Sequence, residues 1–163
     1  MSKINFKQLI FNAIIIAGIF LIDRISKLYI IKLAEIENNL DVYLNEYLNL
    51  YLIWNKGIAF GLFSFDDNFI YNLITLTIII ITTIVLAMMH KSGGFQKYCL
   101  ISIFAGSLGN LFDRIYYSAV PDFIDLHIDN FHWFIFNVAD IFITVGIICL
   151  IYVEIFFNKK NND

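Results

Sequence analysis

The chain has 163 residues, of which 60% are hydrophobic and only 15% are charged, and its mean hydropathy is +0.74. A chain of this length has too little interior to hide so much apolar surface from water, which excludes an ordinary soluble domain and favours an integral membrane protein. The net charge of −3 offers no basic surface to a phosphate backbone, so nucleic acid is not an expected partner.

The sequence predicts four membrane-spanning helices, because about 20 helical residues are needed to cross the hydrocarbon layer. The expected spans lie at about residues 9–31, 69–89, 97–117 and 136–156. The fourth belongs to an apolar segment that begins at Phe131 and contains a single formally charged residue, Asp140. No small-residue cleavage site follows the first apolar segment, so we expect a retained span rather than a signal peptide. The absence of repeats or a linker indicates one integral-membrane domain over residues 1–163.

The distribution of charge sets the expected orientation. Basic residues precede the first span, separate the second from the third, and follow the fourth: Lys3, Lys7, Lys91, Lys97, Lys159 and Lys160. Because lysine and arginine concentrate on the cytoplasmic side of a membrane, we expect both termini in the cytoplasm. The other two loops should then lie outside, and both are acidic.

The first outer loop is expected to carry a small β-element and a membrane-surface segment. Residues Tyr47–Trp54 are rich in Tyr, Leu and Ile, and strand geometry would place alternate residues on one face. The stretch around Leu62–Phe65 is expected to form an aromatic anchor at the interface. The predicted fold is therefore an all-α membrane protein of four transmembrane helices, with a small extracytoplasmic β-sheet and a short amphipathic outer segment.

Polar residues inside the spans are expected to form one layer. In the predicted orientation each lies toward the outer end of its helix: Asp23, Asn110, Asp113, Arg114, Asn137 and Asp140. Ionisable groups at membrane depth are unfavourable and tend to mark function. Asp23 has Lys27 one turn away and Asp113 has Arg114 beside it, so both carboxylates are expected to be ionised and structural. Gly106 and Gly109 would allow another helix or a substrate backbone to approach closely.

The residue types in this layer favour carboxylate chemistry over nucleophilic catalysis. Ser107 has no obvious base, and His127 and His132, in the second outer loop, are expected to be solvated or interfacial. Two carboxylic acids in a low-dielectric site share a proton, so one can activate water while the other protonates the scissile amide. Asp140 is the strongest candidate, because its surroundings are the most apolar and no cation is near it in sequence. Spacing alone does not select its partner from the other aspartates: Asp23, Asp113, Asp122, Asp125 and Asp129.

Five short blocks resemble, in order, the signature motifs of lipoprotein signal peptidases (signal peptidase II): Asp23–Lys27, Asn55–Gly61, Asn110–Arg114, Val120–Asp125 and Phe136–Asp140. The blocks extend over nearly the whole chain, and the ordered set is far more specific than any one of them. The resemblance implies a catalytic dyad of Asp122 and Asp140. It also implies that six residues hold the dyad and the substrate backbone: Asp23, Asn55, Gly57, Asn110, Arg114 and Asn137. Asp113 and Lys27 would be structural.

This resemblance implies an intramembrane aspartic endopeptidase of peptidase family A8, with a β-sheet cradle beside four transmembrane helices. Its substrate would be a prolipoprotein that carries diacylglycerol on a cysteine, and cleavage would fall just before that cysteine. The expected location is the bacterial inner membrane, where a monomer surrounded by membrane lipids would hold its active site near the extracytoplasmic face. The reaction would need no cofactor and no metal ion, and globomycin-type cyclic peptides would inhibit it.

Three positions depart from the usual family pattern without removing a reactive group. Ser118 stands where the family usually has glycine, Pro121 where it has valine and Leu126 where it has phenylalanine. Proline fixes φ and removes one N–H, so the local geometry before Asp122 is expected to differ. The alternative function is a small membrane transporter or channel subunit that uses buried carboxylates. Transport sites tend to lie at the bilayer midplane, whereas these acids are expected near one surface.

Overall fold

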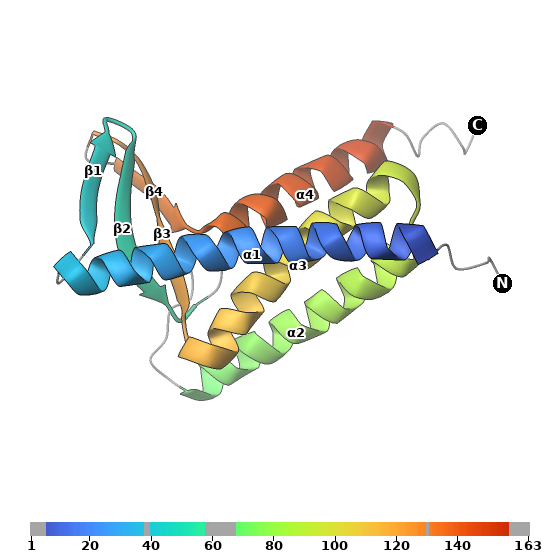
Figure 1. Ribbon diagram of the computed structural model, residues 1–163, viewed down its shortest axis with the longest axis horizontal. Coiled ribbons are helices and arrows are strands. Elements are labelled where there is room, and N and C mark those ends of the chain that lie inside the picture. The colour runs from blue at the N-terminus through green and yellow to red at the C-terminus, as the bar shows by residue number, and fades with distance from the viewer. Residues whose placement is uncertain (1–5, 38–39, 58–67, 130, 157–163) are drawn as a thin grey trace.

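The structure is a computed structural model that describes residues 6–37, 40–57, 68–129 and 131–156. These residues form four helices and one four-stranded antiparallel sheet, which lies at one end of the helices (Figure 1). In chain order the elements are α1 (Phe6–Glu37), β1 (Asp41–Asn45), β2 (Leu48–Asn55), α2 (Asn68–Lys91), α3 (Gly94–Tyr117), β3 (Val120–Ile128), β4 (Phe131–Phe136) and α4 (Val138–Phe156). The start of α1 and the end of α4 lie together at the other end of the bundle, away from the sheet (Figure 1).

Three of the helices, α1, α2 and α4, are long and apolar enough to cross a membrane. Large apolar side chains point outward from each of them, as at Leu21, Ile80 and Ile148, which are all more than half exposed. Helices that are apolar on their outer surface suit a lipid environment. Helix α3 is less apolar because it carries Asp113 and Arg114, whose side chains are buried inside the protein.

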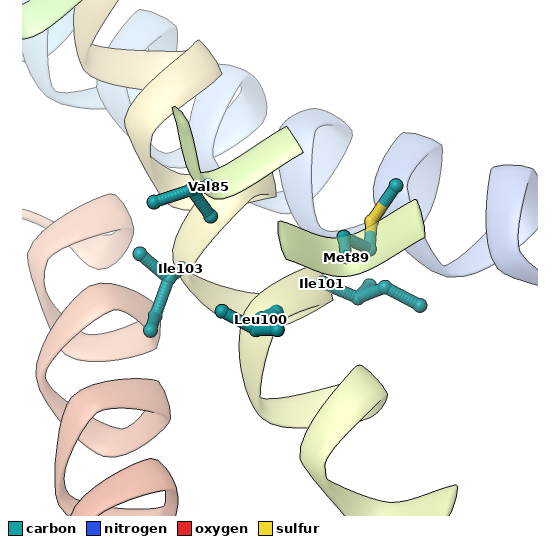
Figure 2. Close-up of a cluster of buried hydrophobic side chains, with 5 residues drawn as sticks. All are labelled: Val85, Met89, Leu100, Ile101 and Ile103. Atoms are coloured by element: carbon teal, nitrogen blue, oxygen red, sulfur yellow. The ribbon is translucent and has the colours of Figure 1, made fainter. Parts of the chain in front are cut away.

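Helix α3 is the centre of the bundle, since it packs against α1, α2 and α4. A cluster of buried apolar side chains joins α2 to α3 at the end away from the sheet (Figure 2): Val85, Met89, Leu100, Ile101 and Ile103. Contact with α4 depends on Gly106, where an added Cβ would lie 2.6 Å from the backbone oxygen of Ala139. The two helices can therefore approach closely only because this position has no side chain.

The sheet has the strand order β1-β2-β3-β4, with every neighbouring pair antiparallel. It packs against the last turns of α1 through a cluster that includes Ile30, Leu40 and Phe123. Strands β3 and β4 form the connection between α3 and α4, so the residues at both ends of this connection are held at the end of the helical bundle. This arrangement brings the start of β3 beside the start of α4.

The connection between α3 and α4 differs from the sequence-based expectation. A loop was expected there, and residues from Phe131 were expected to belong to the apolar segment of the fourth span. The structure instead shows β3 and β4, whereas α4 begins at Val138, close to the predicted start of the fourth span at about residue 136. The predicted strand at Tyr47–Trp54 is confirmed as β2. The amphipathic segment predicted around Leu62–Phe65 lies outside the described residues.

The backbone explains two departures from the family pattern. Ser118 follows α3 with φ 56° and ψ 23°, a left-handed conformation that is usually taken by glycine at a helix end. Pro121 lies in β3, but β4 pairs with β3 only from Ile124 onward. Strand β3 is therefore open on its β4 side at Pro121, while Trp54 of β2 lies opposite Pro121 on the other side. A proline is tolerated here because it stands close to the start of the strand.

Replacing Ser118 by glycine should stabilise the protein by about 1 kcal/mol, because a side chain with Cβ is strained in the left-handed region. The measurement is the thermal unfolding midpoint of the purified chain in detergent. Ser118→Ala keeps the Cβ and should show no such increase. A midpoint that rises equally in both variants, or in neither, would contradict this account of the helix end.

Candidate active site

Six residues with charged or amide side chains line one cavity of about 350 Å³. They come from β2, α3, β3, α4 and the residue before α4: Asn55, Asn110, Arg114, Asp122, Asn137 and Asp140. Much of the remaining wall is apolar and is contributed by α2 and α4, for example by Ile78 and Ile147. The cavity therefore combines a polar end beside the sheet with an apolar part between two helices that can span a membrane.

Asp122 lies near the start of β3 and is only 2% exposed. Each of its carboxylate oxygens accepts a hydrogen bond from an asparagine amide. Asn55 Nδ2 donates to Oδ2 at 2.8 Å, and Asn137 Nδ2 donates to Oδ1 at 2.6 Å. The pairing of β2 with β3 places Asn55 opposite Val120, two residues from Asp122. The carboxylate is thus oriented by neutral donors, which hold it without neutralising its charge.

Asp140 is the third residue of α4 and forms a reciprocal capping box with Asn137, which precedes the helix. The Asp140 backbone N donates to Asn137 Oδ1 at 3.1 Å, and the Asn137 backbone N donates to Asp140 Oδ2 at 3.2 Å. The other carboxylate oxygen, Oδ1, accepts a hydrogen bond from Asn110 Nδ2 at 2.7 Å. The Asn-x-x-Asp spacing is therefore a helix-start signal. Because the Asn137 side-chain amide also donates to Asp122, one residue holds both carboxylates, that of Asp122 through its side chain and that of Asp140 through its backbone N–H.

A cluster of four buried charges lies between α1 and α3, beside the cavity: Asp23, Arg24, Lys27 and Asp113. Lys27 Nζ lies 3.0 Å from Asp23 and 2.7 Å from Asp113. It also donates to Asn110 Oδ1 at 2.9 Å, which connects this ion cluster to the amide that orients the carboxylate of α4. Asp23 in turn accepts a hydrogen bond from the backbone N of Ala139, in the first turn of α4. The predicted pairing of Asp23 with Lys27 is confirmed.

The sequence suggested Arg114 as the cation beside Asp113, but in the structure Asp113 pairs with Lys27 and Arg24. Residues adjacent in a helix point in different directions, and Asp113 turns toward α1, where Lys27 and Arg24 contact it. Arg24 Nη2 lies 2.5 Å from Asp113 Oδ1. Arg114 instead turns toward the cavity. The two neighbours thus belong to separate parts of the site.

Arg114 is fixed at the cavity wall by Gly57 and Tyr71. Its Nη2 donates a hydrogen bond to the backbone oxygen of Gly57, whose own N–H donates to Asn55 Oδ1 at 2.8 Å. The Tyr71 hydroxyl donates to the backbone oxygen of Arg114 at 2.9 Å, and its ring centre lies 5.7 Å from the guanidinium carbon. Nε and Nη1 of Arg114 form no hydrogen bond with the residues that the structure describes. These two donors are therefore available to another molecule in the cavity.

The electrostatics of the cavity favour retention of a proton. Burial, together with the negative charge of Asp140, raises the pKa of Asp122 from 3.8 to about 7, although the hydrogen bonds from Asn55 and Asn137 act in the opposite direction. A carboxyl group with this pKa is partly protonated at neutral pH. With a second carboxyl group, that of Asp140, in the same cavity, the pair can supply a base for water and an acid for a peptide bond, without any further group.

Reading the sequence did not single out Arg24 or Tyr71. The position of Arg24 next to Asp23 inside a predicted span could have indicated a buried charged residue. Nothing in the sequence indicated a role for Tyr71. Of the two alternatives expected for the histidines, solvated or interfacial, the first is wrong for His127, which is on β3 and only 9% exposed. His132, on β4, is exposed as expected.

Comparison with known proteins agrees with this chemistry. The family described as "Signal peptidase (SPase) II" matches residues 15–157. A lipoprotein signal peptidase of Pelagibacter ubique is 56% identical over 163 residues, which is 100% of this chain and 98% of that protein. The lipoprotein signal peptidase of Anaplasma phagocytophilum is 40% identical over 91% of this chain and 94% of its own length. A solved bacterial membrane enzyme, determined by the in meso method, superposes with a TM-score of 0.70 at 25% identity over 93% of this chain and 91% of that one.

Proposed function

Because the chain belongs to the signal peptidase II family of aspartic peptidases, peptidase family A8, we propose that Asp122 and Asp140 form its catalytic dyad. By family and by its relatives, its function is that of a lipoprotein signal peptidase. The observation that carries the proposal is that both carboxylates line one cavity and share hydrogen bonds with Asn137. The family assignment leaves the transporter alternative without support.

In the proposed reaction the dyad holds one proton. The ionised carboxylate accepts a proton from water while the water oxygen attacks the scissile carbonyl carbon, and the protonated carboxyl donates to the carbonyl oxygen. The C–N bond of the tetrahedral intermediate then breaks. The carboxyl that took the proton from water returns it to the leaving amine, and the other carboxylate takes a proton from a hydroxyl of the intermediate, which leaves a carboxylic acid and restores the single proton of the dyad. The amides of Asn55, Asn110 and Asn137 hold the two carboxylates in position throughout.

The remaining polar groups of the cavity are proposed to bind the substrate backbone. Arg114 supports this role, because Nε and Nη1 lack partners among the described residues while Gly57 and Tyr71 fix its position. Donors that are already oriented lose little freedom when they bind a peptide oxygen. The apolar wall from α2 and α4 would accept the hydrophobic part of a signal peptide.

The proposed membrane placement has four spanning helices, including α3, in a single domain of residues 1–163. Both termini are cytoplasmic, because Lys7, Lys91 and Lys97 lie at helix ends on the side away from the sheet (Figure 1). The sheet and the dyad then lie near the extracytoplasmic face. A central α3 whose charged groups are covered by α1 and the cavity residues is compatible with a span.

The proposed substrate is a prolipoprotein that carries diacylglycerol on a cysteine, with cleavage just before that cysteine. The test reconstitutes the purified chain with such a precursor and identifies the products by mass spectrometry. The matched control is the same precursor without the lipid. Cleavage of the lipidated precursor at the expected bond supports the proposal. Cleavage of both precursors at equal rates, or at a different bond, would reject the proposed specificity.

The pH dependence of cleavage should show a decrease above about pH 7. The raised pKa of Asp122 means that the dyad loses its proton in this range, and kcat/KM should then fall by about tenfold per pH unit. Asp122 should also make folding stability depend on pH. The folded state binds more protons than the unfolded state between about pH 4 and pH 7, so stability should fall as pH rises through this interval.

The two measurements are kcat/KM and the thermal unfolding midpoint, each followed over the same pH series. Asp122→Asn removes the titrating group, so the midpoint of this variant should change less with pH than that of the wild-type chain. A rate that continues to rise well above pH 8, or an Asp122→Asn variant with unaltered pH dependence of stability, would contradict the assignment of a protonated dyad.

A further inference from the structure

Three side chains that commonly bind metals meet on the sheet, outside the dyad cavity: Asp125, His127 and His132. Asp125 Oδ2 lies 2.8 Å from His132 Nδ1 and 3.8 Å from His127 Nδ1. One possible ligand atom from each residue lies within 4.8 Å of the others. The strand pairing explains the cluster, because His127 on β3 is directly opposite His132 on β4.

It is unusual that the polar residues of this cluster, rather than their apolar neighbours, occupy the buried face of β3. Asp125 and His127 are 2% and 9% exposed, while the apolar residues that alternate with them on β3, Leu126 and Ile128, are exposed. A strand normally buries its apolar residues, so a specific interaction must favour the polar face. The two histidine rings also stack, with centres 5.3 Å apart.

Several buried polar atoms of the cluster lack a partner. Asp125 Oδ1 and His127 Nδ1 form no hydrogen bond with any part of the chain that is described, and neither does Oδ1 of Asn49. Asn49 is the residue of β2 directly opposite Asp125, and it lines a hollow on the sheet together with Asp125 and His132. Buried oxygens without a donor are unfavourable, and a bound cation would satisfy them.

We propose that Asp125, His127 and His132 form a binding site for a divalent transition metal of the zinc class. Imidazole nitrogen with one carboxylate suits Zn²⁺ and its neighbours, whereas Mg²⁺ and Ca²⁺ prefer oxygen ligands alone. Ligand atoms bonded to one tetrahedral Zn²⁺ lie roughly 3.3 Å apart. Asp125 Oδ2 lies 2.8 Å and 3.8 Å from the two histidine nitrogens, on either side of this value, so small side-chain rotations would complete the site.

The expected role of the metal is to hold the sheet together. It would join β3 to β4, whose ends carry Asp122 and lead directly to Asn137. The metal takes no part in the proposed hydrolysis, because none of its three ligands lines the dyad cavity. The site therefore does not depend on the proposed catalytic roles, and a failure of one proposal would leave the other in place.

Zinc binding to the full chain tests the proposal. The purified chain, in detergent and without a polyhistidine tag, is freed of metal with a chelator and titrated with Zn²⁺ against a chromophoric chelator of known affinity. We expect one Zn²⁺ per chain. His127→Gln and His132→Gln should each weaken binding by at least about tenfold, since loss of even an indirect partner of a metal site has effects of this size.

Two variants serve as matched controls. His90→Gln makes the same change at an exposed histidine at the end of α2, and Asp122→Asn removes a buried carboxylate from the same strand as the cluster. Both should bind Zn²⁺ as the wild-type chain does. Equal binding by all four variants, or a loss in His90→Gln that matches the others, would overturn the proposal.

Co²⁺ provides a measurement that does not depend on the folding of variants. Bound to the wild-type chain at the proposed site, it should give the intense visible absorption of a low-coordinate ion with nitrogen ligands, and Zn²⁺ should displace it. The weak absorption of the hydrated ion at saturating protein would overturn the proposal even if the histidine variants cannot be purified.

Discussion

Replacing either Asp122 or Asp140 by asparagine should reduce cleavage by roughly a thousandfold or more while the chain stays folded. An amide can neither accept a proton from the attacking water nor return one to the leaving amine, and each positioned acid or base contributes about 10²–10⁴-fold. The side chain keeps its shape. One of two neighbouring buried carboxyl groups is lost, so the electrostatic repulsion between them is removed.

The measurement is the cleavage rate of the lipidated precursor, together with the thermal unfolding midpoint of each variant. Asp129→Asn is the matched control, because it makes the same change at an exposed residue after β3 and should retain full activity. Substantial turnover by either dyad variant would reject the assignment of that residue. A variant that is inactive and also unfolded would not distinguish the two causes, and Asp122→Glu and Asp140→Glu then show whether a displaced carboxyl restores any rate.

Replacing Asp113 by asparagine should instead destabilise the protein, by about 3–5 kcal/mol, with a smaller direct effect on chemistry. Asp113 is fully buried and contacts two cations, Lys27 and Arg24. With its charge removed, Asp23 is the one carboxylate of the ion cluster that remains opposite them. An excess positive charge in a site with little water is much more unfavourable than an exposed one.

A double-variant cycle tests this explanation. Lys27→Met removes one positive charge, so the Asp113→Asn/Lys27→Met chain should be more stable than the sum of the single changes predicts. Glu35→Gln, at an exposed carboxylate on α1, should have almost no effect on the unfolding midpoint. An Asp113→Asn chain with wild-type stability and no activity would mean that Asp113 acts in the reaction rather than in the ion cluster.

The helices and part of the site could be predicted from sequence because their signals are local. Apolar runs of membrane length indicate α1, α2 and α4, and Asp140 stands out because it is an isolated aspartate in such a run. The Asn137-to-Asp140 spacing is also local, since the capping box joins residues three apart. The role of Asp122 as the partner of Asp140 has no local signal, because it depends on the pairing of β2 with β3 and on the contact with Asn137. In the sequence, only the family resemblance identified Asp122 as that partner.

The strands β3 and β4 escaped prediction for a physical reason. In the second half of β3 the buried positions are polar, Asp125 and His127, while Leu126 and Ile128 face outward. An alternating pattern is present, but its polarity is the reverse of the usual one, so the apolar face that it indicates is not the buried face. Strand β4 was missed for a different reason. Its residues are mostly apolar and lead directly into a spanning helix, so they resemble the start of that helix. The pairing of Asp113 with α1 rather than with Arg114 likewise depends on helix packing.

The length of α1 has a consequence for how a precursor could be chosen. Asp23, which contacts the first turn of α4, comes 17 residues after Phe6, or roughly 26 Å along the helix. In the proposed membrane placement, with the start of α1 at the cytoplasmic edge of a hydrocarbon layer about 30 Å thick, the ion cluster and the adjoining proposed dyad would come at the level where acyl chains meet their glycerol ester groups. Diacylglycerol attached to a cysteine holds that residue at the same depth. We therefore expect the lipid to act as an anchor that sets the depth of the scissile bond in the membrane. Shorter or longer acyl chains should then change the cleavage rate less than removal of the glycerol linkage does.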